Sequence, residues 1–103
     1  MSKINFLILF GLGLGITGCT RDYEPKTNAD GKAIFKAACA ECHKAEDSNQ
    51  PEIFFTLDEK NANPTYIAHK VHSGSIMMPK FPNIKKTKMR MLSKYVLEHS
   101  AID

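Results

Sequence analysis

The sequence predicts a small all-α domain of three to four helices behind an N-terminal export signal. Three observations support this fold class. The chain has 103 residues, so it holds one domain at most. Residues that start helices stand in front of three segments that carry apolar residues at helical spacing. No segment of convincing length alternates as a strand does, and the chain contains no repeat or low-complexity stretch.

Residues 1–18 are predicted to be a signal peptide. Lys3 precedes an unbroken run of apolar residues and glycines over 6–16, which is short for a permanent transmembrane helix and typical of an export signal. The run ends in Ile16-Thr17-Gly18-Cys19, which resembles the lipobox of bacterial lipoproteins. The resemblance implies that Cys19 receives a diacylglyceryl group and becomes the new N-terminus. An ordinary signal peptide that happens to contain a cysteine is the alternative.

Residues 19–28 are predicted to form a tether after the lipidated cysteine. The stretch is polar, lacks apolar periodicity and contains one proline. Fully extended, it would reach roughly 30 Å. The folded domain, predicted for residues 29–103, would therefore stay near a membrane, facing the periplasm or the cell exterior.

The three predicted helices begin at recognisable positions. The first is expected from Asn28 or Asp30, since either side chain can cap free backbone N–H groups. The second is expected at Pro64, because Asn63 is a capping residue and proline is favoured at the first helical position. The third is expected from about Thr87, and four of its residues share one face at i, i+3, i+4 and i+7. These residues are Leu92, Tyr95, Val96 and His99.

The chemistry lies in Cys39-Ala40-Glu41-Cys42-His43, directly after the first helix. Two cysteines separated by two residues can form thioethers to the two vinyl groups of one porphyrin, and the adjoining histidine then binds the iron. The motif therefore predicts one covalent haem c, attached by Cys39 and Cys42, with His43 as the proximal iron ligand. A thioredoxin-like pair would need a βαβ context, and a zinc site would need further ligands. Neither is present.

With this motif the chain resembles a small class I cytochrome c from about residue 29 to residue 100. In that family, a glycine and an aromatic residue of the first helix lock onto the last helix. The matching residues here are Gly31, Phe35, Leu92 and Tyr95. Residues 66–82 contain Gly74 and Met-Met-Pro, and they resemble the family's middle helix and methionine-ligand loop. The resemblance implies that three to four helices wrap around one covalently attached haem.

The sixth iron ligand is predicted to be a methionine, a soft and neutral donor that favours ferrous iron. Met78 directly precedes Pro79, as the ligand precedes its proline in the family, so Met78 is the predicted distal ligand. Met77 is the runner-up, with ordinary packing as its other interpretation. His69 or His72 could give bis-histidine ligation instead, although exposed helix positions explain both.

Residues around the haem are predicted with less specificity. His43 needs an acceptor for its Nδ1–H to fix the orientation of its ring. A proline carbonyl often serves in the family, and Pro51 is the candidate here. His99 suits the role of a cation at a helix end. Four apolar residues are expected to line the haem, and these are Ile53, Phe54, Phe55 and Leu57.

Charge excludes one class of partner and suggests another. Without Lys3, residues 19–103 carry 13 of the 14 basic residues against 11 acidic ones, which argues against nucleic acid. A cluster of cations after Met78 is either a docking surface for an acidic redox partner or a solvated basic face. The cluster consists of Lys80, Lys85, Lys86, Lys88 and Arg90.

The resemblance implies single-electron transfer between membrane-associated redox partner proteins, through iron that cycles between two oxidation states. No small-molecule substrate is transformed, so the chain is not predicted to be an enzyme in its own right. One alternative is a haem-bearing relay subunit of a larger oxidoreductase complex. The other is a haem ligand sensor, which would require an open or easily displaced sixth position.

Overall fold

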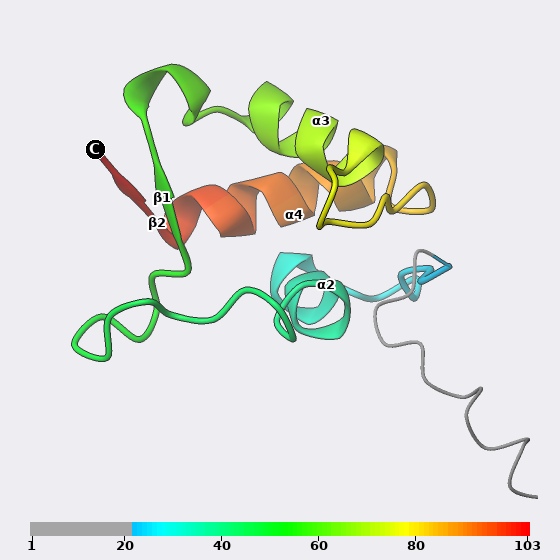
Figure 1. Cartoon of the computed structure of the whole chain (residues 1–103). Helices are drawn as coiled ribbons and strands as arrows, with labels where there is room; N and C mark the ends of the chain where they lie inside the picture. The colour runs from blue at the N-terminus through cyan, green and yellow to red at the C-terminus, as the bar shows by residue number, and fades with distance from the viewer. Residues whose placement is uncertain (1–21) are drawn as a thin grey trace, which may run out of the picture.

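The computed structural model describes residues 22–103, in which three α-helices lie around a common centre (Figure 1). The elements are α2 (Gly31–Ala38), β1 (Phe55–Leu57), the 3-10 turn η3 (Glu59–Asn61), α3 (Pro64–Ser73), α4 (Lys86–Glu98) and β2 (Ser100–Ile102). The predicted signal peptide and Cys19 lie outside the described residues. In residues 22–103, no helix is long and apolar enough to cross a membrane.

The helices begin close to where the sequence predicts them. The Asp30 side chain accepts a hydrogen bond from the Ala33 N–H at 2.9 Å and so caps α2. The Asn63 side chain accepts one from the Tyr66 N–H at 2.9 Å and caps α3. The helix α4 begins at Lys86, and no side chain caps it. Local signals therefore predicted all three helices, which confirms the helical part of the fold class.

The short strands were not predicted. β1 and β2 pair in parallel, with Phe55 opposite Ser100. The Phe54 N–H donates to the His99 carbonyl at 2.9 Å, and the Asp103 N–H donates to the Leu57 carbonyl at 2.8 Å. Because each strand has three residues, neither is long enough to show an alternating pattern. The pairing ties the segment after the cysteine motif to the C-terminus.

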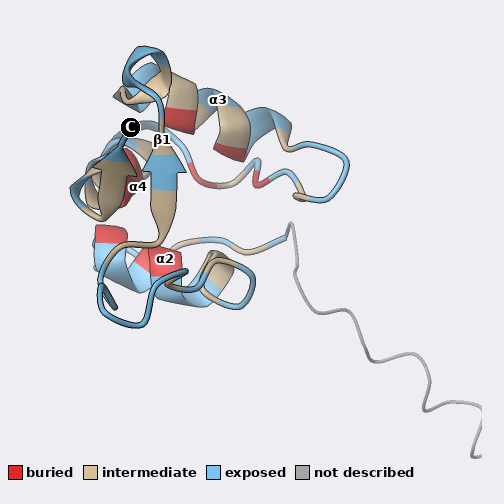
Figure 2. Cartoon of the chain, turned by 60° about the vertical axis from the view of Figure 1, so that its left-hand side comes forward, coloured by how far each residue is buried: buried red, intermediate tan, exposed pale blue. Residues whose placement is uncertain are grey.

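The first and last helices cross in close contact, as the resemblance implied. A Cβ atom on Gly31 would collide with the Met91 carbonyl oxygen and lie 2.9 Å from the Tyr95 Cβ. Phe35 is 2% exposed, and its ring lies 5.4 Å from that of Tyr95. Figure 2 shows buried residues on the inward sides of α2, α3 and α4. Glycine at position 31 therefore lets the two backbones approach.

Candidate haem site

The cysteine motif continues the last turn of α2. The Cys39 N–H donates to the Phe35 carbonyl at 2.8 Å, which ends the helix. The N–H groups of Cys42 and His43 then both donate to the Cys39 carbonyl, at 3.2 and 2.9 Å. This tight turn brings Cys39, Cys42 and His43 to the wall of one cavity.

Two apolar cavities adjoin this turn and share three residues, Cys39, His43 and Met78. One has a volume of about 160 Å³, and its other walls are Ala38, Cys42, Met77, Pro79 and Phe81. The second has a volume of about 190 Å³, and its other walls are Phe55, Leu57, Tyr66, Ile67, Lys70, Val71, Leu92 and Val96. The residues present fit a covalently bound haem, because two thiols, an imidazole and a thioether meet in mainly apolar surroundings.

Burial shifts the pKa values of Cys39 and His43, the two residues at the centre of this site. Desolvation, with a smaller contribution from Cys42, raises the pKa of the Cys39 thiol to about 12. Desolvation lowers the pKa of His43 below its usual range. Burial therefore favours the neutral imidazole, which is the form whose ring nitrogen can bind a metal.

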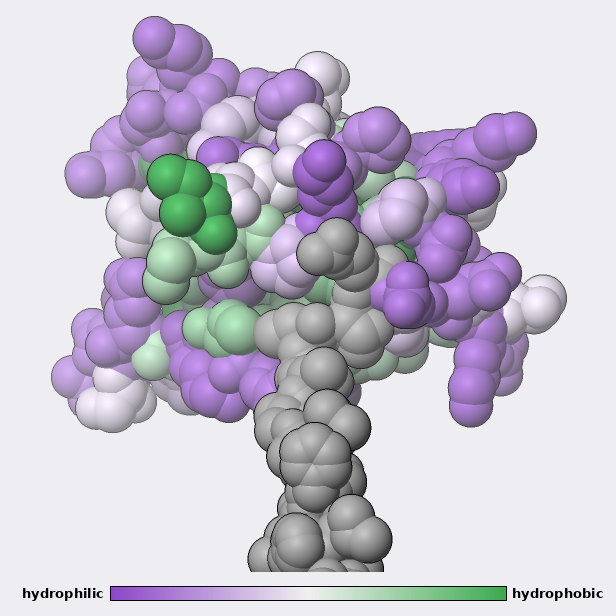
Figure 3. Space-filling view, turned by 45° about the vertical axis from the view of Figure 1, so that its right-hand side comes forward, coloured by the Kyte–Doolittle hydropathy of each residue, from purple (hydrophilic) through white to green (hydrophobic). Residues whose placement is uncertain are grey.

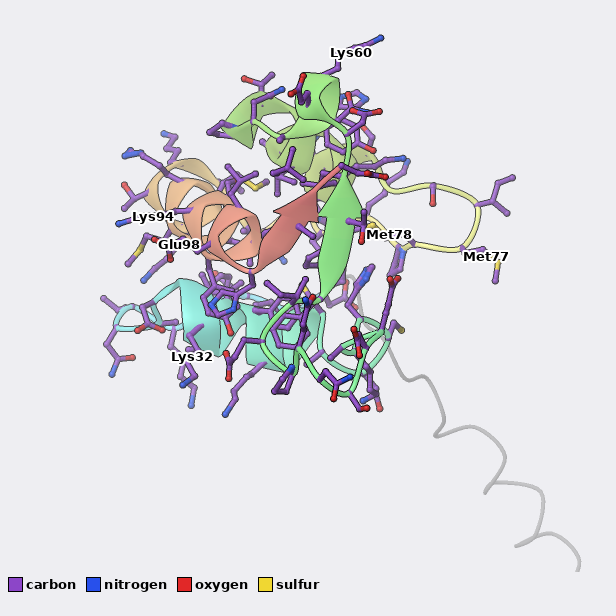
Figure 4. The ribbon with its side chains drawn as sticks, turned by 90° about the vertical axis from the view of Figure 1, so that its left-hand side faces the viewer. Lys32, Lys60, Met77, Met78, Lys94 and Glu98 are labelled. Carbon is purple, nitrogen blue, oxygen red and sulfur yellow. The ribbon has the colours of Figure 1, made fainter. Side chains whose placement is uncertain are left out.

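The loop between α3 and α4 separates the two candidate distal ligands. Met77 is 90% exposed, whereas Met78 is partly buried against the core and lines both cavities. In Figure 4, Met77 lies at the outer end of the loop and points away from the domain, while Met78 lies towards β1. The assignment of Met78 as iron ligand stays a prediction; Met78 lines both cavities with His43, whereas Met77 lines only the smaller one.

Gly74 creates the turn that positions Met78. It ends α3 with φ 68° and ψ −163°, a conformation that residues with a side chain rarely adopt. A Cβ atom at this position would lie 2.6 Å from the Met78 carbonyl oxygen. That oxygen accepts a hydrogen bond from the Ser75 N–H at 2.9 Å, so the loop folds back on itself directly after the helix.

Comparison with known proteins decides the family. Residues 26–96 match the family described as Cytochrome C oxidase, cbb3-type, subunit III. The chain belongs to this family. No curated protein and no solved structure matches the chain. The match includes the cysteine motif and the Met78 loop, and membership makes the chain a small monohaem c-type cytochrome, an electron-transfer protein with covalently bound haem c.

Other predicted site residues of the cytochrome do not all lie at the haem site. Pro51 and His43 line the same surface groove, but the described structure contains no hydrogen bond between the His43 ring and the Pro51 carbonyl. His69 and His72 are exposed and line a groove that contains neither His43 nor Met78. Their arrangement supports the interpretation as surface residues. His99 Nδ1 lies 2.8 Å from the Glu52 carbonyl oxygen and 3.6 Å from its carboxylate.

The apolar residues after the motif divide between two roles. Phe55 and Leu57 line the larger cavity, and the Phe55 ring lies 4.8 Å from the His43 ring. Phe54 stacks on Phe35 at 5.0 Å instead. Sequence reasoning missed the contribution of α3, where Tyr66 and Lys70 lie one turn apart and both line the larger cavity. Their spacing of four residues was the available signal.

The members of the predicted basic cluster differ in their contacts and exposure. Lys88 Nζ donates to the Thr27 carbonyl at 2.8 Å and to the Ala29 carbonyl at 2.6 Å, so the ammonium group of Lys88 is hydrogen-bonded within the protein. The remaining members are exposed, and these are Lys80, Lys85, Lys86 and Arg90. Lys88 therefore serves the N-terminal segment rather than a docking surface.

Proposed function

We propose that the chain is a lipid-anchored monohaem cytochrome that passes single electrons between membrane-associated redox partners. The observation that carries the proposal is the meeting of Cys39, His43 and Met78 on two adjoining apolar cavities. A site that supplies an imidazole and a thioether would give the iron of a bound haem two protein ligands, which suits electron transfer better than ligand binding.

Each residue of the site has a separate task. Cys39 and Cys42 would hold the haem through thioethers, the His43 imidazole would provide one iron ligand, and the Met78 sulfur would provide the other. When bound, the haem supplies an iron that accepts or releases one electron. The apolar walls exclude water, and a thioether ligand raises the potential relative to a second imidazole. The chain itself transforms no substrate.

The description of the family favours a second candidate, an electron-relay subunit of a larger oxidoreductase. Purification from detergent-solubilised membranes distinguishes the two. A free carrier elutes as a monomer with one haem, whereas a relay subunit elutes in a complex of fixed stoichiometry. A haem sensor is tested separately, since carbon monoxide should bind the reduced protein readily only if Met78 leaves the sixth position open.

Lipid anchoring is proposed from Ile16-Thr17-Gly18-Cys19. A diacylglyceryl group adds two acyl chains, enough for stable retention on a membrane. Cells fed a fatty-acid analogue should label the wild-type chain, whereas Cys19→Ser should not be labelled. Equal labelling of both chains would refute the lipoprotein assignment while leaving the haem site unaffected.

A further inference from the structure

The N-terminal segment is held against the domain from the first described residue onward. Asn83 Nδ2 donates to the Asp22 carbonyl at 3.4 Å, and Lys88 Nζ donates to the carbonyls of Thr27 and Ala29. These contacts bridge parts of the chain that are about 60 residues apart in sequence. Within the segment expected to be a tether, residues 22–28 are therefore held against α4 and the loop before it.

The fixed segment shortens the reach of a lipid anchor. Tyr23 packs against the apolar core, so the chain is already part of the domain at that point. From Cys19 to Asp22 there are three residue steps, which span at most about 10 Å by covalent geometry. The headgroup layer on each side of a bilayer is roughly 5–8 Å thick. With Cys19 acylated, as proposed above, the domain must touch the membrane surface near Asp22.

The surface at this end carries two exposed apolar side chains. Figures 1 and 2 show the loop between α3 and α4 at the same end of the molecule as the first described residues. At the tip of that loop, Ile76 is 100% and Met77 is 90% exposed. Figure 3 shows a strongly apolar spot on this otherwise mainly polar face. Adjacent large apolar side chains on a loop tip suit insertion into the headgroup region of a membrane.

Cations follow this apolar tip in the sequence. Lys80, Lys85 and Lys86 are exposed, and they stand on either side of Asn83 in the chain, whose side chain donates to the Asp22 carbonyl. The first turn of α4 contains no acidic residue. Asp22 and Glu24 offset part of this charge, but residues 60–103 as a whole carry eight basic and two acidic residues. Lysines in this position attract anionic headgroups within about 8 Å at physiological ionic strength.

We infer that this end of the molecule is a membrane face, made of Ile76, Met77, Lys80, Lys85 and Lys86, and that it rests on an anionic lipid surface. The apolar tip enters the headgroup layer, and the lysines bind lipid phosphates around it. Met77 also lines the smaller cavity of the haem site, so this orientation turns the Met77 side of that cavity towards the bilayer.

The rate at which the lysines react with an amine-reactive reagent tests this orientation. The lipidated holoprotein is placed in vesicles of phosphatidylcholine with one third phosphatidylglycerol, and its lysines are modified by an amine-reactive reagent and quantified by mass spectrometry. Detergent-solubilised protein serves as the reference. Lys80, Lys85 and Lys86 should react several-fold more slowly in the vesicles. Three exposed lysines away from the Met77 loop should react at unchanged rates, and these controls are Lys32, Lys60 and Lys94 (Figure 4).

Two variants sharpen the test. Ile76→Asp should remove much of the protection and leave the haem spectrum unchanged, because the native side chain contacts no core residue. Ile102→Asp, at a position that is 52% exposed elsewhere, should have no effect. If the intact mass shows that Cys19 is acylated but the three lysines react as fast as in detergent, the membrane face alone is wrong. If the intact mass shows that Cys19 is unmodified, both the anchor and the face are wrong. Protection that depends on an acidic partner protein and not on vesicles would also overturn the membrane face.

Discussion

Replacing Gly74 by alanine should loosen the loop that carries Met78 without replacing any residue that lines the two cavities. Gly74 has φ 68° and ψ −163°, a region that is essentially restricted to glycine. The new Cβ atom would also lie 2.6 Å from the Met78 carbonyl oxygen, closer than real contacts allow. The turn must therefore open, and it opens at the residue that is proposed to bind iron.

The size of the effect follows from the backbone conformation. Forcing a residue with a side chain into this region costs about 1–3 kcal/mol. If the loop relieves about 2 kcal/mol by releasing Met78, the equilibrium between the positioned and the displaced loop shifts roughly 30-fold. An external ligand that needs the vacated position should then bind the ferric protein roughly 30-fold more tightly.

Imidazole titration of the ferric protein, followed by the absorption spectrum, measures this shift. Ser73→Ala is the matched control, since Ser73 is an exposed residue at the end of α3 and its replacement should change stability by less than about 0.5 kcal/mol. An affinity that is unchanged in Gly74→Ala would refute the argument that this turn positions Met78. An equal increase in Ser73→Ala would show that any change near the loop has the same effect.

Three further outcomes are expected. Wild-type protein should keep its haem through denaturing electrophoresis, whereas the double variant Cys39→Ser, Cys42→Ser should lose it. Release of haem from the wild type would contradict covalent attachment. Met78→Ala should abolish the weak far-red sulfur-to-iron band of the ferric protein and lower its potential, whereas Met77→Ala should leave both in place. Lys88→Met should lower the free energy of unfolding by roughly 2 kcal/mol, because it removes two partly exposed charge-assisted hydrogen bonds. Thermal unfolding monitored by circular dichroism checks the last value.

The parts of the fold that were predicted depend on local signals. Asp30 and Asn63 cap their helices within three residues, and the cysteine motif occupies five consecutive positions. The pairing of Phe55 with Ser100 could not be predicted, because it joins distant segments that are too short to show periodicity. The position of Lys70 in the wall of the larger cavity was missed for a different reason. A lysine on a helix is usually solvated, and its sequence alone does not reveal the cavity beside it.

The N-terminal segment makes contacts that its composition does not reveal. Residues 19–28 lack the apolar periodicity that would bury them, and this absence predicted a tether. However, every residue also offers a backbone carbonyl, and Lys88 donates to the carbonyl of Thr27 and to that of Ala29, directly after the segment. A polar segment can therefore be fixed by a distant cation without any signal in its own sequence. If Cys19 is acylated as proposed, the reach from the anchor to Asp22 is about 10 Å in place of roughly 30 Å, which would hold the domain at the membrane surface. A carrier held this closely would exchange electrons with partners in the plane of the membrane.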